Sequence, residues 1–379
     1  MERADALGLL QPLVGNALDS AAEERSLLCG IIGDHPSEYA KSPSIWNAAF
    51  AALEIDAAYL PFDVTAEQLP ALVAALRRLP TFAGGNVTVP YKLAVMESLD
   101  EVDPTAARIG AVNTLRRTED GRLIGYNTDA DGVVGSLLTP APWRPTPPLT
   151  SLDGLCVLIV GAGGAGRAAA FGVAQHLGEG RLLIANRSEA AARELAEAVA
   201  AADGNADAVE NAELAGAVAS ADVVINASSV GQSGMRRLPG GRATCLEGYS
   251  PLAPANPPAY AESEFADDEA FHRAWLAAAG EDIAANGRAS AQAIAAAKPH
   301  ALFFDLIYSP AETPMLRQAR LGGHDTLNGQ GMNILQAVEG FVRRVMAEPL
   351  EAMGLTREDA YARVFNAMAA VWAGRIAQR

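Results

Sequence analysis

The stretch LCVLIVGAGGAGRAAAFGVAQHLG, residues 155–178, decides the fold class, because it joins an apolar strand, a glycine-rich turn and a helix. Its glycines, Gly161, Gly163 and Gly166, allow a tight turn and let a pyrophosphate approach the free N–H groups at the helix N-terminus. A GxGxxG pattern alone is weak evidence, but here it directly follows a strand and opens a helix. The stretch therefore predicts a dinucleotide-binding turn.

The segments that follow continue the same alternation. RLLIANR (181–187) is typical of a strand, SEAAARELAEAVAAA (188–202) of a helix and ADVVINASS (221–229) of another strand. Strands that alternate with helices favour a parallel, doubly wound sheet. We predict an α/β protein with a Rossmann-like nucleotide domain in its C-terminal half.

The end of the second predicted strand selects the cofactor. NAD-binding versions of this unit carry an acid there, which holds the ribose 2′-OH. This chain instead has Asn186, Arg187 and Ser188. An arginine would pair with a 2′-phosphate, which favours NADP over NAD. The alternatives are that Arg187 is an ordinary surface arginine and that Glu189 weakens phosphate binding.

Residues 27–135 form a second α/β pattern, with polar residues at strand ends. GNVTVPYK (85–92) ends in Lys92, and a hairpin around TEDG (118–121) would place Asn113 opposite Asn127, with Asp129 two residues further on the same face. An amine and a carboxylate at one site suit proton transfer coupled to hydride transfer. Ordinary turn polarity explains these residues equally well from spacing alone.

Lysine is rare in this chain, and this bears on the choice. The sequence holds only Lys41, Lys92 and Lys298, and its other basic side chains, histidine apart, are arginine. A surface charge can be either residue, whereas a proton-transferring amine cannot be arginine. A chemical role at Lys41 or Lys92 is therefore favoured.

Composition excludes several classes of function. The formal net charge of −16 argues against a nucleic-acid partner and requires a local cationic site for any anionic ligand. No apolar run is long enough for a membrane span, and the N-terminus does not resemble a secretory signal, so we expect a cytoplasmic protein. Cys29, Cys156 and Cys245 have neither zinc-ligand nor disulfide spacing, and we expect no metal.

Two segments lie outside these patterns. Residues 136–153 are rich in Pro and Thr and are typical of a linker. Residues 232–266 are rich in Pro and Gly without periodicity, and 267–300 are typical of one or two helices. A partly disordered segment, a lid and a crossover insertion all remain open for this region. DLIYSP (305–310) continues a further strand, and helices are expected beyond it.

Several segments together resemble the shikimate dehydrogenase family. They are KSPSIWN (41–47), GNVTVPYK (85–92), GAVNT (110–114), GYNTDADG (125–132), GAGGAG (161–166), NRS (186–188), NASSVG (226–231), DLIYSP (305–310) and NGQGMNILQ (328–336). The resemblance implies a two-domain enzyme that reduces 3-dehydroshikimate to shikimate with NADPH. It implies a substrate-binding catalytic domain at 27–135, with helices of 331–379 returning to it. The NADP-binding domain would be 136–330 with an insertion at 236–300, and 1–26 would be an N-terminal extension.

The resemblance also implies roles for individual residues. Lys92 and Asp129 match the catalytic pair. The implied substrate-binding residues are Ser42, Thr88, Asn113, Tyr308 and Gln336, and the implied NADP-binding residues are Gly161, Ala162, Gly163, Gly164, Ala165, Asn186, Arg187, Ser188, Leu306 and Gly329. A small carboxylated ring is the expected substrate, and a monomer or homodimer the expected state.

The chain departs from the family pattern at two informative positions. Ala40 replaces a serine that donates to the substrate carboxylate, and Ala191 stands where a further arginine often follows the NRS segment. Two alternatives follow. One is a quinate/shikimate or aminoshikimate-type dehydrogenase that uses NAD or an altered substrate. The other is a non-catalytic NADP-binding regulator, which need not keep both Lys92 and Asp129.

Overall fold

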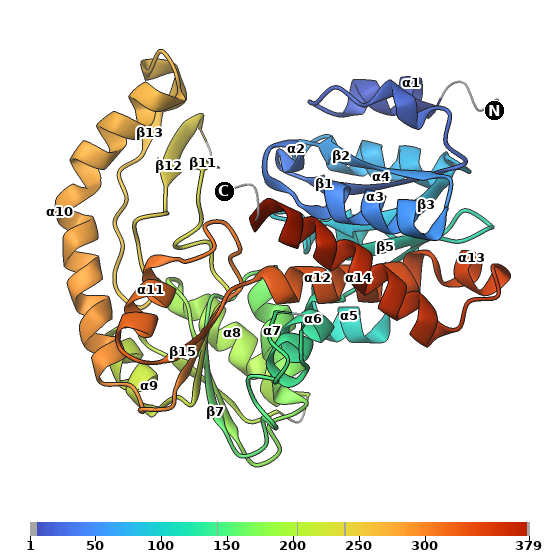
Figure 1. Cartoon of the computed structure of the whole chain (residues 1–379). Helices are drawn as coiled ribbons and strands as arrows, with labels where there is room; N and C mark the ends of the chain where they lie inside the picture. Colours follow the sequence, from blue (N-terminus) through green and yellow to red (C-terminus); the bar gives the residue numbers. More distant parts are fainter. Residues whose placement is uncertain (1–5, 142, 203, 239, 377–379) are drawn as a thin grey trace. The chain divides into compact units, whose positions relative to one another are not determined.

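The computed structural model describes residues 6–141, 143–202, 204–238 and 240–376 (Figure 1). Residues 1–5 of the expected N-terminal extension and 377–379 of the expected terminal helix lie outside the described residues. The chain divides into two compact units, and each is described by itself. Unit 1 holds residues 1–148 and 331–379, and unit 2 holds 149–330. The chain passes from unit 1 to unit 2 within the segment expected to be a linker.

Unit 1 is built on a six-stranded mixed sheet with the order β2-β1-β3-β5-β6-β4. The strands are β1 (Leu27–Gly33), β2 (Ala57–Asp63), β3 (Phe82–Val87), β4 (Glu101–Val102), β5 (Thr114–Arg117) and β6 (Leu123–Tyr126). The helices are α1 (Ala6–Leu10), α2 (Pro36–Tyr39), α3 (Ser42–Leu53), α4 (Leu69–Arg78), α5 (Pro104–Ile109), α6 (Asp129–Leu138), α12 (Gln330–Glu339), α13 (Ala347–Ala352) and α14 (Arg357–Ile376). Shorter helical turns are η2 (Gln11–Leu13), η3 (Ser20–Ala22), η4 (Ala94–Ser98) and the π-helical η7 (Gly340–Val345).

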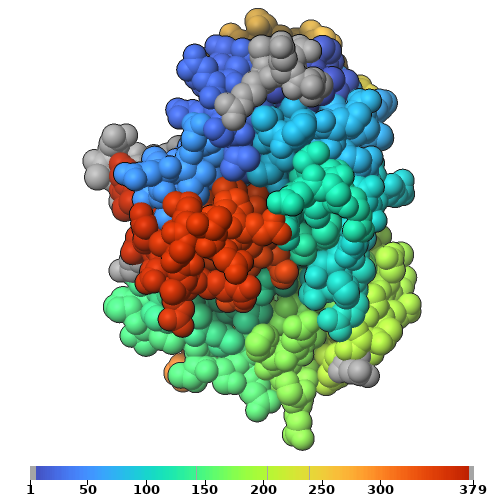
Figure 2. Space-filling model, turned by 90° about the vertical axis from the view of Figure 1, so that its right-hand side faces the viewer, coloured from blue at the N-terminus to red at the C-terminus, as the bar shows by residue number. Residues whose placement is uncertain are grey.

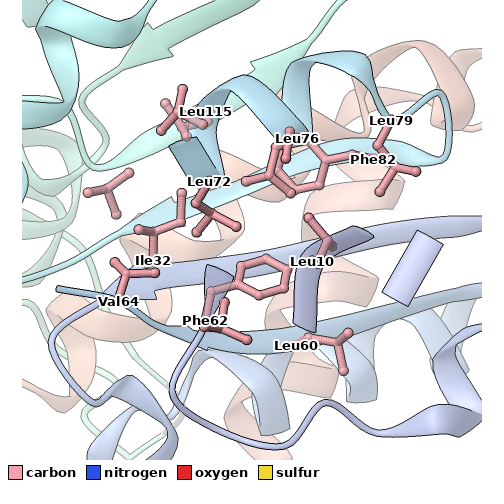
Figure 3. Packing of buried hydrophobic residues seen from close by; sticks show 14 of the residues in the cluster. Leu10, Ile32, Leu60, Phe62, Val64, Leu72, Leu76, Leu79, Phe82 and Leu115 are labelled. Carbon is pink, nitrogen blue, oxygen red and sulfur yellow. The ribbon is translucent and has the colours of Figure 1, made fainter. Parts of the chain in front are cut away.

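The side chains of β1 alternate between two apolar clusters, one on each face of this sheet. Leu28 and Ile32 enter the first cluster, whereas Cys29 and Ile31 enter the second. Figure 3 shows the first cluster, in which Leu10 of α1 packs with residues of the strands and of α4. The N-terminal helix therefore contributes to the core of unit 1.

Helices from the C-terminal residues cover the second face. The rings of Trp46 in α3 and Phe341 in η7 lie 5.0 Å apart between centroids. Val364 and Met368 of α14 join the same cluster and are fully buried. In Figure 2 the C-terminal residues, in red, lie against the blue and cyan residues of the N-terminal half. Unit 1 is therefore discontinuous in sequence.

The hairpin register agrees with the prediction, but the segment after it does not. β5 and β6 pair antiparallel with Thr114 opposite Tyr126, which brings Asn113 beside Asn127. Asp129 was expected on a strand face, whereas it is the first residue of helix α6. The helix was missed because Gly132 and Gly135 lower its helix propensity. Close packing requires the first of these glycines, since a Cβ at Gly132 would lie 2.8 Å from the carbonyl oxygen of Met332.

Unit 2 has a six-stranded sheet in the order β15-β14-β10-β7-β8-β9, with every pair parallel. The strands are β7 (Cys156–Val160), β8 (Arg181–Ala185), β9 (Ala206–Val209), β10 (Val223–Asn226), β14 (Leu302–Asp305) and β15 (Asp325–Leu327). The helices are α7 (Gly164–Ala174), α8 (Glu189–Ala200), α9 (Leu214–Ser220) and α11 (Pro314–Leu321), with a short turn η5 (Asn211–Glu213). The sequence order reverses at β7, which lies between β8 and β10. The predicted α/β class with a Rossmann-like parallel sheet is confirmed.

The insertion is folded over its described residues. It forms a small sheet of β11 (Met235–Leu238), β12 (Arg242–Cys245) and β13 (Tyr260–Ala261), the turn η6 (Glu262–Glu264) and one long helix, α10 (Asp268–Ala295). Tyr249, Phe271 and Trp275 form an apolar cluster of its own. Asn286 of α10 fixes the preceding loop, because its Nδ2 donates to the carbonyl of Ser250 at 3.0 Å. Across the described residues, no helix has both the length and the apolar character to cross a membrane.

Candidate functional site

The polar site of unit 1 is centred on an ion pair between Lys92 and Asp129. Lys92 follows β3 in a turn, and its Nζ donates to Oδ2 of Asp129 at 2.5 Å. The two side chains are 14% and 4% exposed, so the charges meet in a largely buried setting. Asp129 stands at the N-terminus of α6, where the helix dipole stabilises a carboxylate. An ammonium has three protons, and Asp129 is its one hydrogen-bond partner among the described residues.

Asn113 joins this pair to the rest of the site. Its Nδ2 donates to Oδ1 of Asp129 at 2.8 Å and to Oε1 of Gln336 at 3.2 Å. Its Oδ1 accepts from the backbone N–H of Thr128 at 2.8 Å. Both oxygens of the Asp129 carboxylate are therefore bound, one by an amide and one by the ammonium, which fixes the carboxylate's orientation.

A chain of buried hydrogen bonds extends from Asn113 across the sheet. Asn86 of β3 donates from Nδ2 to the carbonyl of Asn113 at 3.2 Å and accepts from the Tyr59 hydroxyl at 2.6 Å. The side chain of Ser42 also bonds the Tyr59 hydroxyl, and burial raises the pKa of Tyr59 well above its ordinary value. A buried polar network therefore connects Ser42, at the start of α3, with the Lys92–Asp129 pair.

Thr88 lies at the same end of β3 but outside this network. Its backbone N–H donates to the carbonyl of Ile32 at 2.9 Å, and the residue is half-buried. The Cγ2 of Thr88 would lie 2.4 Å from a Cβ placed at Gly33. Glycine at position 33 thus leaves the space that the threonine methyl occupies. Six residues of unit 1 were predicted to bind substrate or to take part in catalysis. Five of them belong to one hydrogen-bond network: Ser42, Lys92, Asn113, Asp129 and Gln336. The sixth, Thr88, directly follows strand β3, which contributes Asn86 to this network.

The glycine turn of unit 2 lies at the carboxyl end of β7. Gly161 has φ +120°, and a Cβ at Gly166 would lie 2.0 Å from the Gly161 carbonyl oxygen, so both positions need glycine. A Cβ at Gly163 would meet no atom within 4 Å. Gly163 is exposed, and Gly164 and Ala165 start α7, where backbone N–H groups have no partner within the helix. The turn can therefore accept a pyrophosphate.

The Asn186–Ser188 segment packs beside this turn. Asn186 accepts from the N–H of Ala162 through Oδ1 at 3.2 Å, and Ser188 caps α8 by accepting from the N–H of Ala191. Arg187 is exposed. Glu189 accepts from the backbone N–H of Asn211 at 3.0 Å, so this acid has its own partner. The segment can present a guanidinium next to the turn.

A third group of predicted residues follows the neighbouring strands β14 and β15. A Cβ at Gly329 would lie 2.0 Å from the carbonyl oxygen of Leu306, so these two predicted nicotinamide-lining positions are in close contact. Burial raises the pKa of Tyr308 to about 12, which keeps its hydroxyl protonated at neutral pH. Nearby, Asp305 is fully buried and accepts from Thr313, Ile307 N–H and Asn226. Burial raises the pKa of Asp305 to about 7 despite these donors.

Sequence reasoning missed several buried polar residues of these sites. Asn127 and Thr128 directly precede Asp129, and Asn127 accepts from the Asp129 N–H at 3.1 Å. The run of polar residues in GYNTD was the available signal for them. Tyr59 gave no such signal, because a tyrosine in an apolar strand is typical of core. Among the described residues, no group of three His, Cys, Asp or Glu side chains could hold a metal ion.

Comparisons with known proteins agree with this architecture. Residues 31–115 match a family described as the shikimate dehydrogenase substrate binding domain, and residues 148–236 match one described as shikimate / quinate 5-dehydrogenase. A protein named shikimate dehydrogenase (NADP(+)) from Citrifermentans bemidjiense is 35% identical over 323 residues, covering 84% of this chain and 89% of that protein. Its counterpart from Methanothermobacter thermautotrophicus is 35% identical over 339 residues, covering 89% and 96%.

Solved structures give the same result. Shikimate 5-dehydrogenase from Thermus thermophilus, in complex with NADP(H) and shikimate, has a TM-score of 0.59 and 26% identity, covering 90% of this chain and 99% of that one. Quinate dehydrogenase from Corynebacterium glutamicum, in complex with NAD, has a TM-score of 0.63 and 27% identity, covering 91% and 99%. With the relatives above a third identical over more than four-fifths of its length, the chain belongs to the shikimate dehydrogenase family.

Proposed function

We propose that this protein is an NADP-dependent shikimate dehydrogenase, which interconverts 3-dehydroshikimate and shikimate. The observation that carries the proposal is the Lys92–Asp129 ion pair, in a chain whose other unit has an open glycine turn. The names of the Citrifermentans and Methanothermobacter relatives support the same activity and cofactor.

In this proposal Lys92 handles the proton. Reduction turns the substrate carbonyl into an alkoxide-like oxygen, which needs one proton, and the Lys92 ammonium supplies it. Asp129 orients the ammonium and, with Asn113 and Gln336, holds hydroxyls of the ring. In the reverse direction the neutral amine takes the proton from the hydroxyl. Bound NADPH supplies the hydride.

The residues present fit that cofactor. Gly161 and Gly166 form a turn with no room for side chains, and the space in front of Gly163 is open. We assign the pyrophosphate to the N–H groups of this turn and the adenosine 2′-phosphate to Arg187 with Ser188 and Asn186. Leu306 and Gly329 would line the nicotinamide. Ser42 and Thr88 are further substrate-binding residues that we assign in unit 1, and Tyr308 is the one that we assign in unit 2.

A quinate dehydrogenase that uses NAD is the second candidate. Ala191 supports the use of NAD, because no second arginine stands there to pair with a 2′-phosphate. Ala40 supports an altered ring site, because a missing hydroxyl donor to a bound carboxylate costs roughly 1.5–3 kcal/mol. The similar structure from Corynebacterium glutamicum, a quinate dehydrogenase with NAD, supports it as well. A non-catalytic NADP-binding regulator is the third hypothesis, and the retained Lys92–Asp129 pair argues against it.

One assay separates these three readings. Purified protein is tested with shikimate and with quinate, each with NADP and with NAD, by following absorbance of the reduced cofactor. We expect shikimate with NADP to give the highest kcat/KM. Faster oxidation of quinate with NAD would favour the second candidate, and no turnover in any pairing would favour the regulator.

We also propose that the enzyme works in the cytoplasm, as a monomer or homodimer, without a nucleic-acid partner. The net charge of −16 supports the last point, because nucleic-acid binding depends on neutralising phosphates. Light scattering on the purified chain tests the oligomeric state, and a mass above that of a dimer would contradict it.

A further inference from the structure

Arg236, on the first strand of the insertion, is hydrogen-bonded to a loop at the carboxyl end of the parallel sheet of unit 2. Its Nη1 donates to the hydroxyl of Ser229, in the loop that follows β10. The neighbouring Arg237 pairs with Glu262 of the insertion at 3.4 Å. Consecutive side chains of a strand point to opposite faces, so only Arg236 is directed toward this loop.

The loop that contains Ser229, the hydrogen-bond partner of Arg236, adjoins the glycine turn. A Cβ at Gly161 would lie 2.8 Å from the backbone of Ala227 and Ser228, directly before Ser229. Asn186, on the other side, accepts from the N–H of Ala162 in the same turn. Ser229 and Arg187 therefore belong to segments that both border the glycine turn, at the carboxyl ends of β10 and β8.

The charge of Arg187 also acts on Arg236. Arg236 is exposed, yet partial burial of its guanidinium and then the charge of Arg187 lower the pKa of Arg236. No ion pair joins either guanidinium to a carboxylate among the described residues, and Glu189 is engaged with Asn211. Two close guanidinium groups without an acid between them repel each other, and a bound dianion would remove this cost.

The first turn of α8 offers no cationic side chain. Its charged residue is Glu189, and its residue 191 is alanine, which contributes only a backbone N–H bonded to Ser188. A second cation for an anion at Arg187 therefore comes from outside this turn, and strand β11 supplies Arg236.

We propose that Arg236 is the second cationic ligand of the NADP 2′-phosphate, acting with Arg187, so that the insertion helps to set cofactor preference. This inference rests on the proposed NADP-dependent function. We expect the bound anion to be a phosphate monoester, because two guanidinium groups can each form a bidentate pair with the oxygens of this dianion. The pyrophosphate of the same cofactor is assigned to the backbone of the glycine turn and does not need Arg236.

Calorimetric titration with 2′,5′-ADP and with AMP tests the proposal directly, since these two probes differ only by the 2′-phosphate. Wild-type protein should bind 2′,5′-ADP more tightly than AMP. Arg236→Gln and Arg187→Gln should each weaken 2′,5′-ADP binding roughly 10- to 100-fold and change AMP binding less than about twofold. Arg237→Gln, the matched control on the same strand, should match wild type with both probes. In turnover assays Arg236→Gln should raise the KM for NADP and leave kcat at saturating NADP unchanged.

The outcomes are distinguishable. If Arg187→Gln loses the preference for 2′,5′-ADP and Arg236→Gln keeps it, the role of Arg236 is wrong and NADP dependence stands. If wild-type protein does not prefer 2′,5′-ADP and turns over only with NAD, the proposed cofactor itself is wrong. Unchanged AMP binding shows that a variant is folded, so a lost preference then reports on the 2′-phosphate.

Discussion

The Lys92–Asp129 ion pair joins two residues that the sequence pointed to on chemical grounds. The scarcity of lysine favoured a chemical role at Lys41 or Lys92, and the structure brings the ammonium of Lys92 to a buried carboxylate. The catalytic roles of the two residues stay predictions, because an ion pair alone has a structural explanation. Kinetics of variants at position 92 decide between these explanations.

Replacing Lys92 should reduce turnover far more than binding. For Lys92→Ala we expect kcat to fall about 10²–10⁴-fold with little change in KM, because the general acid is lost while hydroxyl-binding groups remain. Lys92→Arg should be similarly slow, since a guanidinium does not release its proton near neutral pH. Lys298→Ala, at a half-exposed lysine paired with Asp222, is the control and should keep wild-type kcat. A Lys92→Ala variant with unchanged kcat would remove this residue from the chemistry.

Asp305 should make the stability of the protein pH-dependent near neutrality. Its folded pKa, about 7, lies above the ordinary value of 3.8, so its stabilising contribution is complete below pH 3.8 and is lost as the pH rises through 7. We expect the free energy of unfolding of wild type, relative to Asp305→Asn, to fall between pH 5 and pH 8. At about 1.4 kcal/mol per pKa unit the fall should reach a few kcal/mol. Urea unfolding at both pH values measures it, and parallel pH profiles would contradict the prediction.

At the scale of elements, the period of apolar residues predicted most of the two sheets. It failed where packing overrides local preference. α6 was missed because its glycines are poor helix formers, yet Gly132 is needed where α6 meets α12. β11 and β12 were missed because MRRL and RATC are short and lie among Pro and Gly residues, without an alternating pattern. Such elements depend on partners that a local window of sequence does not contain.

Two glycines of the same turn should respond differently to alanine. Gly166→Ala puts a Cβ 2.0 Å from the Gly161 carbonyl oxygen, so the turn must shift, and we expect a destabilisation of at least about 1–3 kcal/mol. Gly163→Ala has open space and an ordinary φ of −77°, so stability should stay near wild type. Because that space is assigned to the pyrophosphate, Gly163→Ala should nevertheless weaken NADP binding. Thermal unfolding and cofactor titration check both, and equal stability loss in the two variants would contradict the assignment.

At the scale of the molecule, the two units depend differently on the C-terminal residues. Removing 331–379 takes Phe341, Val364 and Met368 from the cluster around Trp46 and leaves unit 2 intact. We expect this truncated chain to keep 2′,5′-ADP binding and to lose both turnover and the buried fluorescence of Trp46. The Trp46 emission is obtained by subtracting the spectrum of the same truncated chain with Trp46→Phe. If this difference spectrum were native-like, the cluster around Trp46 would not need these helices.

The discontinuity of unit 1 has a consequence for synthesis. A ribosome synthesises the chain from the N-terminus to the C-terminus, so β1 and α3 leave the ribosome long before η7 and α14. All of unit 2 is available in between and can finish folding while Trp46 and Phe50 still lack their cover. Until η7 and α14 have been synthesised, unit 1 therefore exposes apolar side chains that the folded protein buries. We expect chaperone binding to be most important during that interval.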